Sequence, residues 1–111
     1  MHMGPYNGKD VTTGYRISYD QKANGRLMLV RSKGRETTVL AEANGVTALG
    51  DGRRHLLVWT RDAAGRMSVK VDRKEVLAAQ DTTFSSDFSG FSFVNVAGVW
   101  NLHDISIYSM R

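Results

Sequence analysis

The stretch Met67–Asp81, MSVKVDRKEVLAAQD, decides the fold class because it has the pattern of a two-stranded hairpin. Apolar and polar side chains alternate from Met67 to Asp72, and a second short apolar run follows after only two or three residues. Alternation with a period of two is typical of a strand that is buried on one face. This stretch therefore predicts two antiparallel strands joined by a short turn.

The turn of this hairpin lacks the glycine that tight turns between strands favour. A two-residue turn requires positive backbone φ angles, for which Asn-Gly or Asp-Gly is preferred, yet here Asp72 is followed by Arg73 and Lys74. Either Arg73 adopts a left-handed conformation at a cost of about 1 kcal/mol, or the loop is longer and uses Lys74 and Glu75. The sequence leaves both arrangements open.

Similar runs, separated by turn residues such as Asn-Gly and Gly-Asp-Gly, fill the rest of the chain, and no segment has a helical period. The expected strands are GYRISYD (14–20), RLMLVRS (26–32), TTVLAEA (37–43), HLLVWTR (55–61), MSVKVD (67–72), EVLAAQ (75–80), GFSFVNV (90–96) and HDISIYS (103–109). HLLVWTR is apolar on both faces, which is typical of a strand at the centre of a sheet. The pattern predicts an all-β, antiparallel β-sandwich of about eight strands, jelly-roll-like and either complete or truncated.

The length and composition are those of one globular domain. The chain has 111 residues, of which 41% are hydrophobic and 23% charged. We assign residues 14–111 to a single β-sandwich domain and residues 1–13 to a weakly patterned N-terminal lead-in. Because cysteine is absent, neither disulfides nor thiolate metal sites hold the fold. No signal peptide is recognisable at the start, and the compartment stays unknown.

The charge is moderately basic, with 15 Lys and Arg against 11 Asp and Glu and a net charge of +4. Such an excess attracts nucleic acid, acidic lipid or acidic polysaccharide when it is concentrated in one block. Here the basic residues are spread along the chain, which favours a mixed, solvated surface. No apolar run approaches the roughly 20 residues of a membrane span. We therefore expect neither nucleic acid nor a membrane as a partner.

The residues that carry hydrolytic chemistry are not in catalytic patterns. Glycoside hydrolysis needs two carboxyl groups a few ångströms apart, and the glutamates Glu36, Glu42 and Glu75 have no acidic partner at the spacing that a catalytic strand uses. His103 and Asp104 are adjacent and would point to opposite faces of a strand. We interpret His55 as a half-buried partner of a backbone carbonyl group. The sequence predicts no enzyme, and no His or Cys spacing indicates zinc.

Read in order, several segments resemble the later strands of concanavalin A-like lectin/glucanase jelly rolls, in particular the LamG-like modules. They are GYRISYD, GRLMLVRS, TTVLAEA, GDGRRHLLVWTRDAAGRMSVKVD, DTTFSSDFSGFSFVNV and HDISIYS. The resemblance runs from Gly14 to Met110 and covers the C-terminal part of that fold. Arg54-His55 stands where the family has Trp-His, and Asp72-Arg73 stands where it has Asp-Gly. The early strands of the family have almost no room in this chain.

The resemblance implies a non-catalytic carbohydrate-binding module, lectin-like and found outside the cell or on its surface. Candidate ligand-binding residues are Trp100, Tyr19, Tyr108 and His55. A closing-strand Asp contributes to a calcium site in some LamG-like modules, which makes Asp104 a candidate metal ligand. Trp59 is expected to fill the core, whereas Trp100 is either a lid over the core or a platform for a sugar.

The alternative function is a structural or self-association module that pairs with another chain through exposed strands. Because the early strands of the family are missing, one sheet should end in an uncovered edge, and long unpaired edges recruit other strands. The candidate edges are Tyr15–Tyr19 and Ile105–Tyr108. Two-fold symmetry is the commonest closed arrangement, so a homodimer is the expected assembly.

Overall fold

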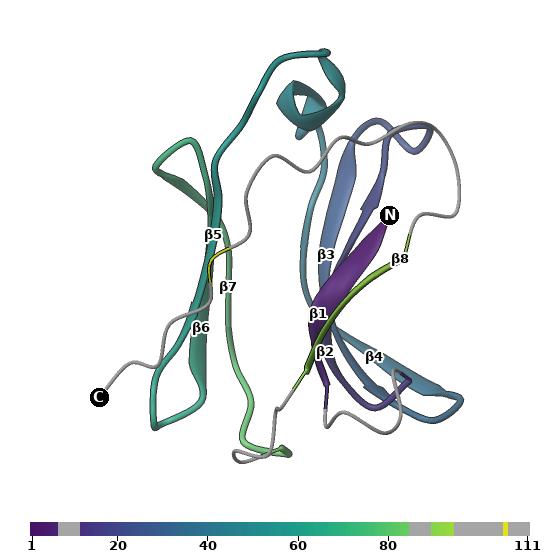
Figure 1. Cartoon of the computed structure of the whole chain (residues 1–111), viewed down its shortest axis with the longest axis vertical. Coiled ribbons are helices and arrows are strands. Elements are labelled where there is room, and N and C mark those ends of the chain that lie inside the picture. Colours follow the sequence, from purple (N-terminus) through teal and green to yellow (C-terminus); the bar gives the residue numbers. More distant parts are fainter. Residues whose placement is uncertain (7–11, 85–89, 95–105, 107–111) are drawn as a thin grey trace.

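The computed structural model describes residues 1–6, 12–84, 90–94 and 106 (Figure 1). Its elements are β1 (His2–Tyr6), β2 (Gly14–Asp20), β3 (Arg26–Lys33), β4 (Glu36–Ala43), the 3-10 helix η1 (Thr47–Gly50), β5 (Leu57–Arg61), β6 (Arg66–Val71), β7 (Lys74–Gln80) and β8 (Gly90–Val94). The prediction of an all-β fold with about eight strands is confirmed. Within the described residues, no helix has the length and apolar character needed to cross a membrane.

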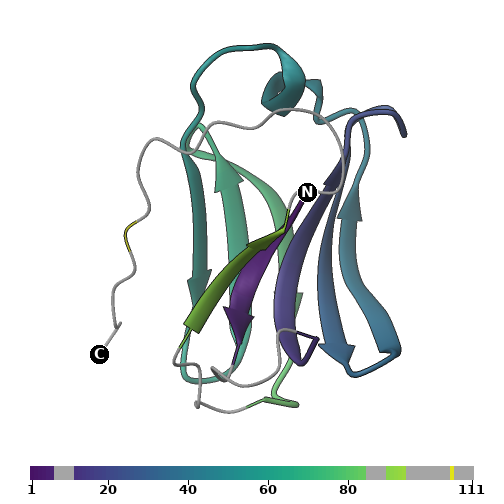
Figure 2. The same cartoon turned by 45° about the vertical axis from the view of Figure 1, so that its right-hand side comes forward.

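The strands form two antiparallel sheets that face each other (Figures 1 and 2). The larger sheet has the order β4-β3-β2-β1-β8 and the smaller has the order β5-β6-β7. Every strand pair is antiparallel. Strand β7 contacts β3 and β4, so the two sheets come together along the β4 and β7 edges.

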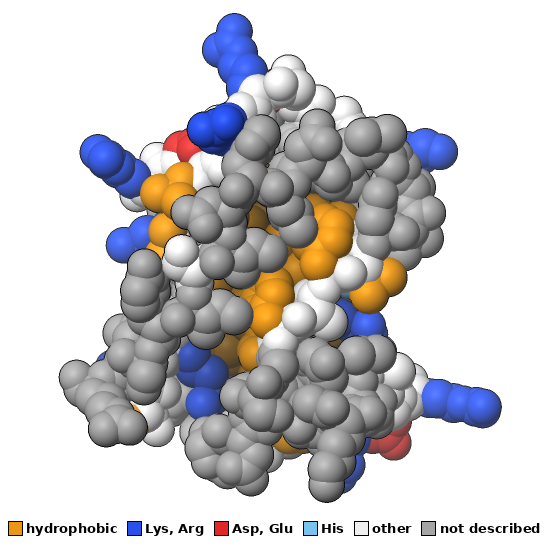
Figure 3. All heavy atoms as spheres, in the orientation of Figure 1, with side chains coloured by type: hydrophobic (Ala, Val, Ile, Leu, Met, Phe, Trp, Pro, Cys, Tyr) orange, Lys and Arg blue, Asp and Glu red, His pale blue; other side chains and the backbone are white. Residues whose placement is uncertain are grey.

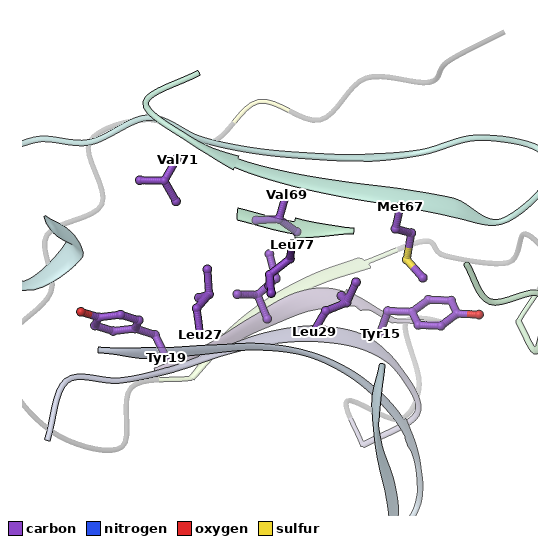
Figure 4. Packing of buried hydrophobic residues seen from close by; sticks show 9 residues of the cluster. Tyr15, Tyr19, Leu27, Leu29, Met67, Val69, Val71 and Leu77 are labelled. Carbon is purple, nitrogen blue, oxygen red and sulfur yellow. The ribbon is translucent and has the colours of Figure 1, made fainter. Parts of the chain in front are cut away.

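The core lies between the sheets and is built from the alternating residues that the sequence pattern indicated (Figure 4). Its buried members are Tyr15, Ile17 and Tyr19 of β2, Leu27 and Leu29 of β3, Met67, Val69 and Val71 of β6, and Leu77 of β7. Fully burying one such aliphatic side chain contributes about 1.5 to 3 kcal/mol. Trp59 of β5 is paired with Val69 and packs against this core, as predicted, although it stays partly exposed.

The turn between β6 and β7 contains two residues, Asp72 and Arg73, and both are left-handed. Their φ angles are 51° and 73°, and Val71 pairs directly with Lys74 across the turn. The first of the two arrangements left open by the sequence is therefore the one adopted. Because non-glycine residues rarely take this conformation, the turn needs contacts from elsewhere to hold it.

One prediction about the strands is wrong. The lead-in contains β1, which lies between β2 and β8, so β2 is paired on both sides and the Tyr15–Tyr19 edge does not exist. Among the described strands β5 pairs with β6 alone, and the position of HLLVWTR at the centre of a sheet stays a prediction. The second candidate edge, 105–108, lies outside the described residues except for Ser106.

Gly4 in β1 provides a test of the newly found strand. A Cβ atom on Gly4 would lie 2.0 Å from the backbone oxygen of Tyr15, so Gly4→Ala must push β1 away from β2. We expect the free energy of unfolding to fall by about 2 to 3 kcal/mol, measured by urea denaturation. The control Gly34→Ala has open space and a φ of 60° and should cost about 1 kcal/mol. Equal losses in the two variants would contradict the β1–β2 pairing.

Candidate functional site

His55 is held between two carboxylates at the end of the sandwich where the β6–β7 turn lies. Its Nε2 is 2.8 Å from Oδ1 of Asp51, and its Nδ1 is 2.5 Å from Oδ2 of Asp72. Only 13% of the His55 side chain is exposed. A ring nitrogen donates to a carboxylate only when it carries a proton, so this geometry selects the doubly protonated imidazolium. The expected partner of His55, a backbone carbonyl, is replaced by these two acids.

Asp72 also fastens the left-handed turn to the segment that precedes β5. Its Oδ1 accepts a hydrogen bond from the Leu56 backbone N–H at 3.0 Å, and its own N–H donates to the Leu56 carbonyl at 2.8 Å. On the other side of His55, the Arg53 N–H donates to Oδ1 of Asp51 at 2.8 Å. The group Asp51, His55 and Asp72, here called the His55 clamp, thus joins the 51–56 loop to the tip of the hairpin.

The imidazole and the two carboxylates of the His55 clamp shift each other's pKa values. Hydrogen bonding to Asp51 and then to Asp72 raises the pKa of His55 above its ordinary value of 6.5. The same contact with His55 is the main cause that lowers the pKa of Asp51 and of Asp72. An imidazolium whose two nitrogens are both occupied has no lone pair with which to accept a proton, so His55 is not arranged as a general base.

A second polar cluster lies at the opposite end of the core and centres on Asp81, which follows β7. The Asp81 carboxylate accepts hydrogen bonds from the Tyr15 hydroxyl at 2.6 Å and from the Thr83 N–H at 2.9 Å, and it pairs with the Arg31 guanidinium. The side chain of Asp81 is only 8% exposed. Because Tyr15 and Arg31 belong to the larger sheet, this carboxylate ties the two sheets together.

Arg61 also belongs to the polar cluster around Asp81, where its side chain lies beside Tyr15. Its Nη2 donates to the backbone oxygens of Asp81 at 3.0 Å and Phe84 at 2.8 Å, and its guanidinium carbon lies 5.3 Å from the centroid of the Tyr15 ring. The Tyr15 and Phe84 rings meet edge to face, with centroids 5.4 Å apart. These contacts make Tyr15 a structural residue with no face left for a ligand.

The pKa values at this end follow from burial and hydrogen bonding. Burial is the largest cause that raises the pKa of Tyr15, and the hydrogen bond to Asp81 raises it further. Burial alone would raise the pKa of Asp81, but hydrogen bonds from Tyr15, Thr83 and Arg31 outweigh it and lower the pKa to about 2. Asp81 is therefore ionised over the whole physiological range.

Of the other residues that the sequence suggested as ligand-binding or metal-binding, only Tyr19 lies within the described part of the chain. Tyr19 is 3% exposed, and its hydroxyl donates to the Val46 carbonyl at 2.7 Å, so it belongs to the core. Burial raises the pKa of Tyr19, and the charge of Asp51 raises it further, which places Tyr19 at the same end as the His55 clamp. Trp100, Tyr108 and the candidate metal ligand Asp104 lie outside the described residues.

The part of the chain that the structure describes offers no ready metal site. Within it, no three His, Cys, Asp or Glu side chains are grouped so as to hold an ion. A shallow depression of about 620 Å³ runs beside β6 and is lined by Ser68, Glu75 and neighbouring residues. The described residues that line it include no aromatic side chain on which a sugar would stack.

Comparisons with known proteins do not place this chain in a family. No protein-family model matches it, and no curated protein or solved structure is significantly similar to it. A functional proposal therefore rests on the contacts of the chain itself.

The His55 clamp should give the protein a specific pH dependence. Because the pKa of His55 is higher in the folded state, its stabilisation is complete below about pH 6.5 and is lost as the pH rises through the folded pKa. The stability advantage of the wild type over His55→Gln should therefore shrink as the pH rises above about 6.5, measured by urea denaturation. By NMR, His55 should titrate above 6.5 and His2, whose pKa is lowered mainly by burial, below it. The reverse order would contradict the clamp.

Asp81 should control stability in acid. Its pKa is depressed from 3.8 to about 2, so its contribution is present above about pH 4 and is lost as the pH falls toward 2. We expect this single group to account for about 2 kcal/mol of stability between pH 5 and pH 2. Asp81→Asn should be less stable than the wild type at pH 7 and should lose less on acidification. Parallel acid profiles for the two proteins would show that Asp81 is not the group responsible.

Proposed function

We propose that this chain is a non-catalytic binding module that associates with another polypeptide chain through the exposed edge of β5. The observation that carries the proposal is the conflict between the sequence of this strand and its position. Its segment is apolar on both faces, as in a central strand, yet among the described strands it has one neighbour. On the outer face of this segment, Leu56 and Val58 are 58% and 38% exposed.

Apolar side chains of the described residues lie on the same side of the sandwich. Strand β7 lies against β3 and β4, whereas β5 contacts only β6 among the described strands. Since β8 is the last strand on the far side of the larger sheet, the described part of the sandwich is open between β5 and β8, here called the open side. Figure 3 shows apolar side chains between the two sheets on this side. The inner-face residues that stay partly exposed there are Met3, Leu57, Trp59, Phe91 and Phe93.

Within the described residues, β5 contains neither a bulge nor a proline. Proteins protect exposed edges with bulges, prolines or outward-pointing charges, and β5 keeps a regular register with β6 from Leu57 to Arg61. The edge of β4 differs, because its ladder with β3 contains an irregularity between Leu29 and Val30. These features favour β5 over β4 as the pairing strand.

A second copy of this chain is the first candidate for the partner. Antiparallel pairing of β5 with its own copy would be self-complementary, as a two-fold axis requires. It would also bring the two open sides close together and bury their apolar side chains, which is the main driving force of association. The involvement of His55 and Asp81 in structural contacts supports a module without catalysis.

Carbohydrate binding, which the resemblance to LamG-like modules implies, stays a prediction. It depends on Trp100 and Tyr108, which lie outside the described residues. Of the aromatic side chains whose burial is described, Tyr15 and Tyr19 are buried and the others are only partly exposed. Binding on a glycan array that is lost in Trp100→Ala would favour this function over strand pairing.

Association through β5 can be tested with a matched pair of edge variants. Val58→Lys places a charge on the β5 edge, and in a two-fold dimer the two introduced lysines would repel each other. Val39→Lys makes the same change on β4, where Val39 is 49% exposed. Sedimentation at micromolar concentration should show dimers of the wild type and of Val39→Lys but monomers of Val58→Lys, with similar melting temperatures. A wild type that is monomeric at all concentrations would refute self-association.

A further inference from the structure

The His55 clamp brings together two basic pairs that are distant in the sequence. Arg53 and Arg54 immediately precede His55, and Arg73 and Lys74 immediately follow Asp72. Because the His55 ring and the Leu56 backbone both contact Asp72, the loop and the turn are held side by side. Figure 3 shows Lys or Arg side chains projecting from this upper end of the molecule, over the loop before β5 and at the tip of the hairpin.

The charge of this end is not cancelled by the acids within it. All four basic residues are exposed. The two carboxylates closest to them in the chain, Asp51 and Asp72, are occupied by His55, and Glu75 accepts a hydrogen bond from Ser68 at 2.7 Å. In the described part of the chain, no ion pair involves Arg53, Arg73 or Lys74. The basic end therefore keeps an excess of positive charge available to a partner.

An exposed apolar residue adjoins these charges. Leu56 lies between the clamp and β5 and is 58% exposed, although its backbone is fixed by Asp72. Recognition of nucleic-acid single strands uses aromatic side chains on which the bases stack, and no described aromatic side chain at this end is exposed. Cations around an exposed leucine instead match a chain that carries carboxylates next to an apolar side chain.

We propose that the basic end, defined as Arg53, Arg54, Leu56, Arg73 and Lys74, binds an acidic polypeptide segment that contains an apolar residue. The carboxylates of the segment pair with Arg53, Arg73 and Lys74, and its apolar side chain packs on the exposed leucine. The clamp acts as a positioning group, because it fixes the spacing between the two basic pairs. This surface adjoins the β5 edge at its exposed leucine, but binding there does not require self-association.

The charge requirement can be tested by fluorescence anisotropy with a short synthetic Glu-rich peptide that contains one central Leu. The double variant R73Q/K74Q should weaken binding to the full chain by about tenfold at low ionic strength. The control K33Q/R35Q removes the same charge from the exposed turn between β3 and β4 and should change binding by less than about twofold. If both double variants lost the same affinity for the peptide, binding would reflect only the net positive charge of the protein, and the proposal would be wrong.

The apolar requirement separates an acidic peptide from other polyanions. Leu56→Ser should weaken binding of the Leu-containing peptide several-fold and leave binding of a matched peptide with Ser in place of Leu unchanged. A peptide with Gln in place of Glu should not bind. If a sulfated oligosaccharide or a single-stranded oligonucleotide binds more tightly than the acidic peptide and is insensitive to Leu56→Ser, the site is a general polyanion site and the proposal is wrong.

Discussion

The Asp72 carboxylate is the contact on which the upper end of this protein depends. The turn it occupies has two consecutive left-handed residues, neither of them glycine, and such a turn persists only when its surroundings stabilise it. Asp72 provides this stabilisation by accepting from His55 and from the Leu56 backbone. A glycine at Arg73 would relieve the strain, but Asp72 itself must stay, because its carboxylate joins the loop before β5 to the hairpin tip.

The two carboxylate clusters fix the sandwich at its two ends by different physical means. Asp81 is buried, so its hydrogen bonds act in a low dielectric and must all be made, since an unpaired buried charge is costly. The His55 clamp is closer to solvent and depends on the protonation of one imidazole. Asp81 therefore determines the acid limit of stability, and His55 determines how firmly the upper end is held near neutral pH.

The sequence allowed the sandwich to be predicted because period-two alternation directly reports which residues face the core, as for Met67, Val69 and Val71. It did not reveal β1, whose segment HMGPY combines glycine and proline and fits poorly to strand propensity. The partners of His55 were also missed, because Asp51 and Asp72 lie on separate segments that only the tertiary fold brings together. The unusual Asp72-Arg73 turn was nevertheless a usable signal: a strained turn without glycine implies a side chain that holds it.

The two proposed surfaces constrain each other through charge. The chain carries a net charge of +4, and two copies that met at their basic ends would repel each other. Antiparallel pairing along β5 reduces this repulsion without removing it, because the basic end lies before Leu57 and the two copies run in opposite directions, which places their basic ends at opposite ends of the shared ladder. An acidic segment bound at each end would then lower the repulsion between the protomers, so occupancy of the basic end and association through β5 should favour each other.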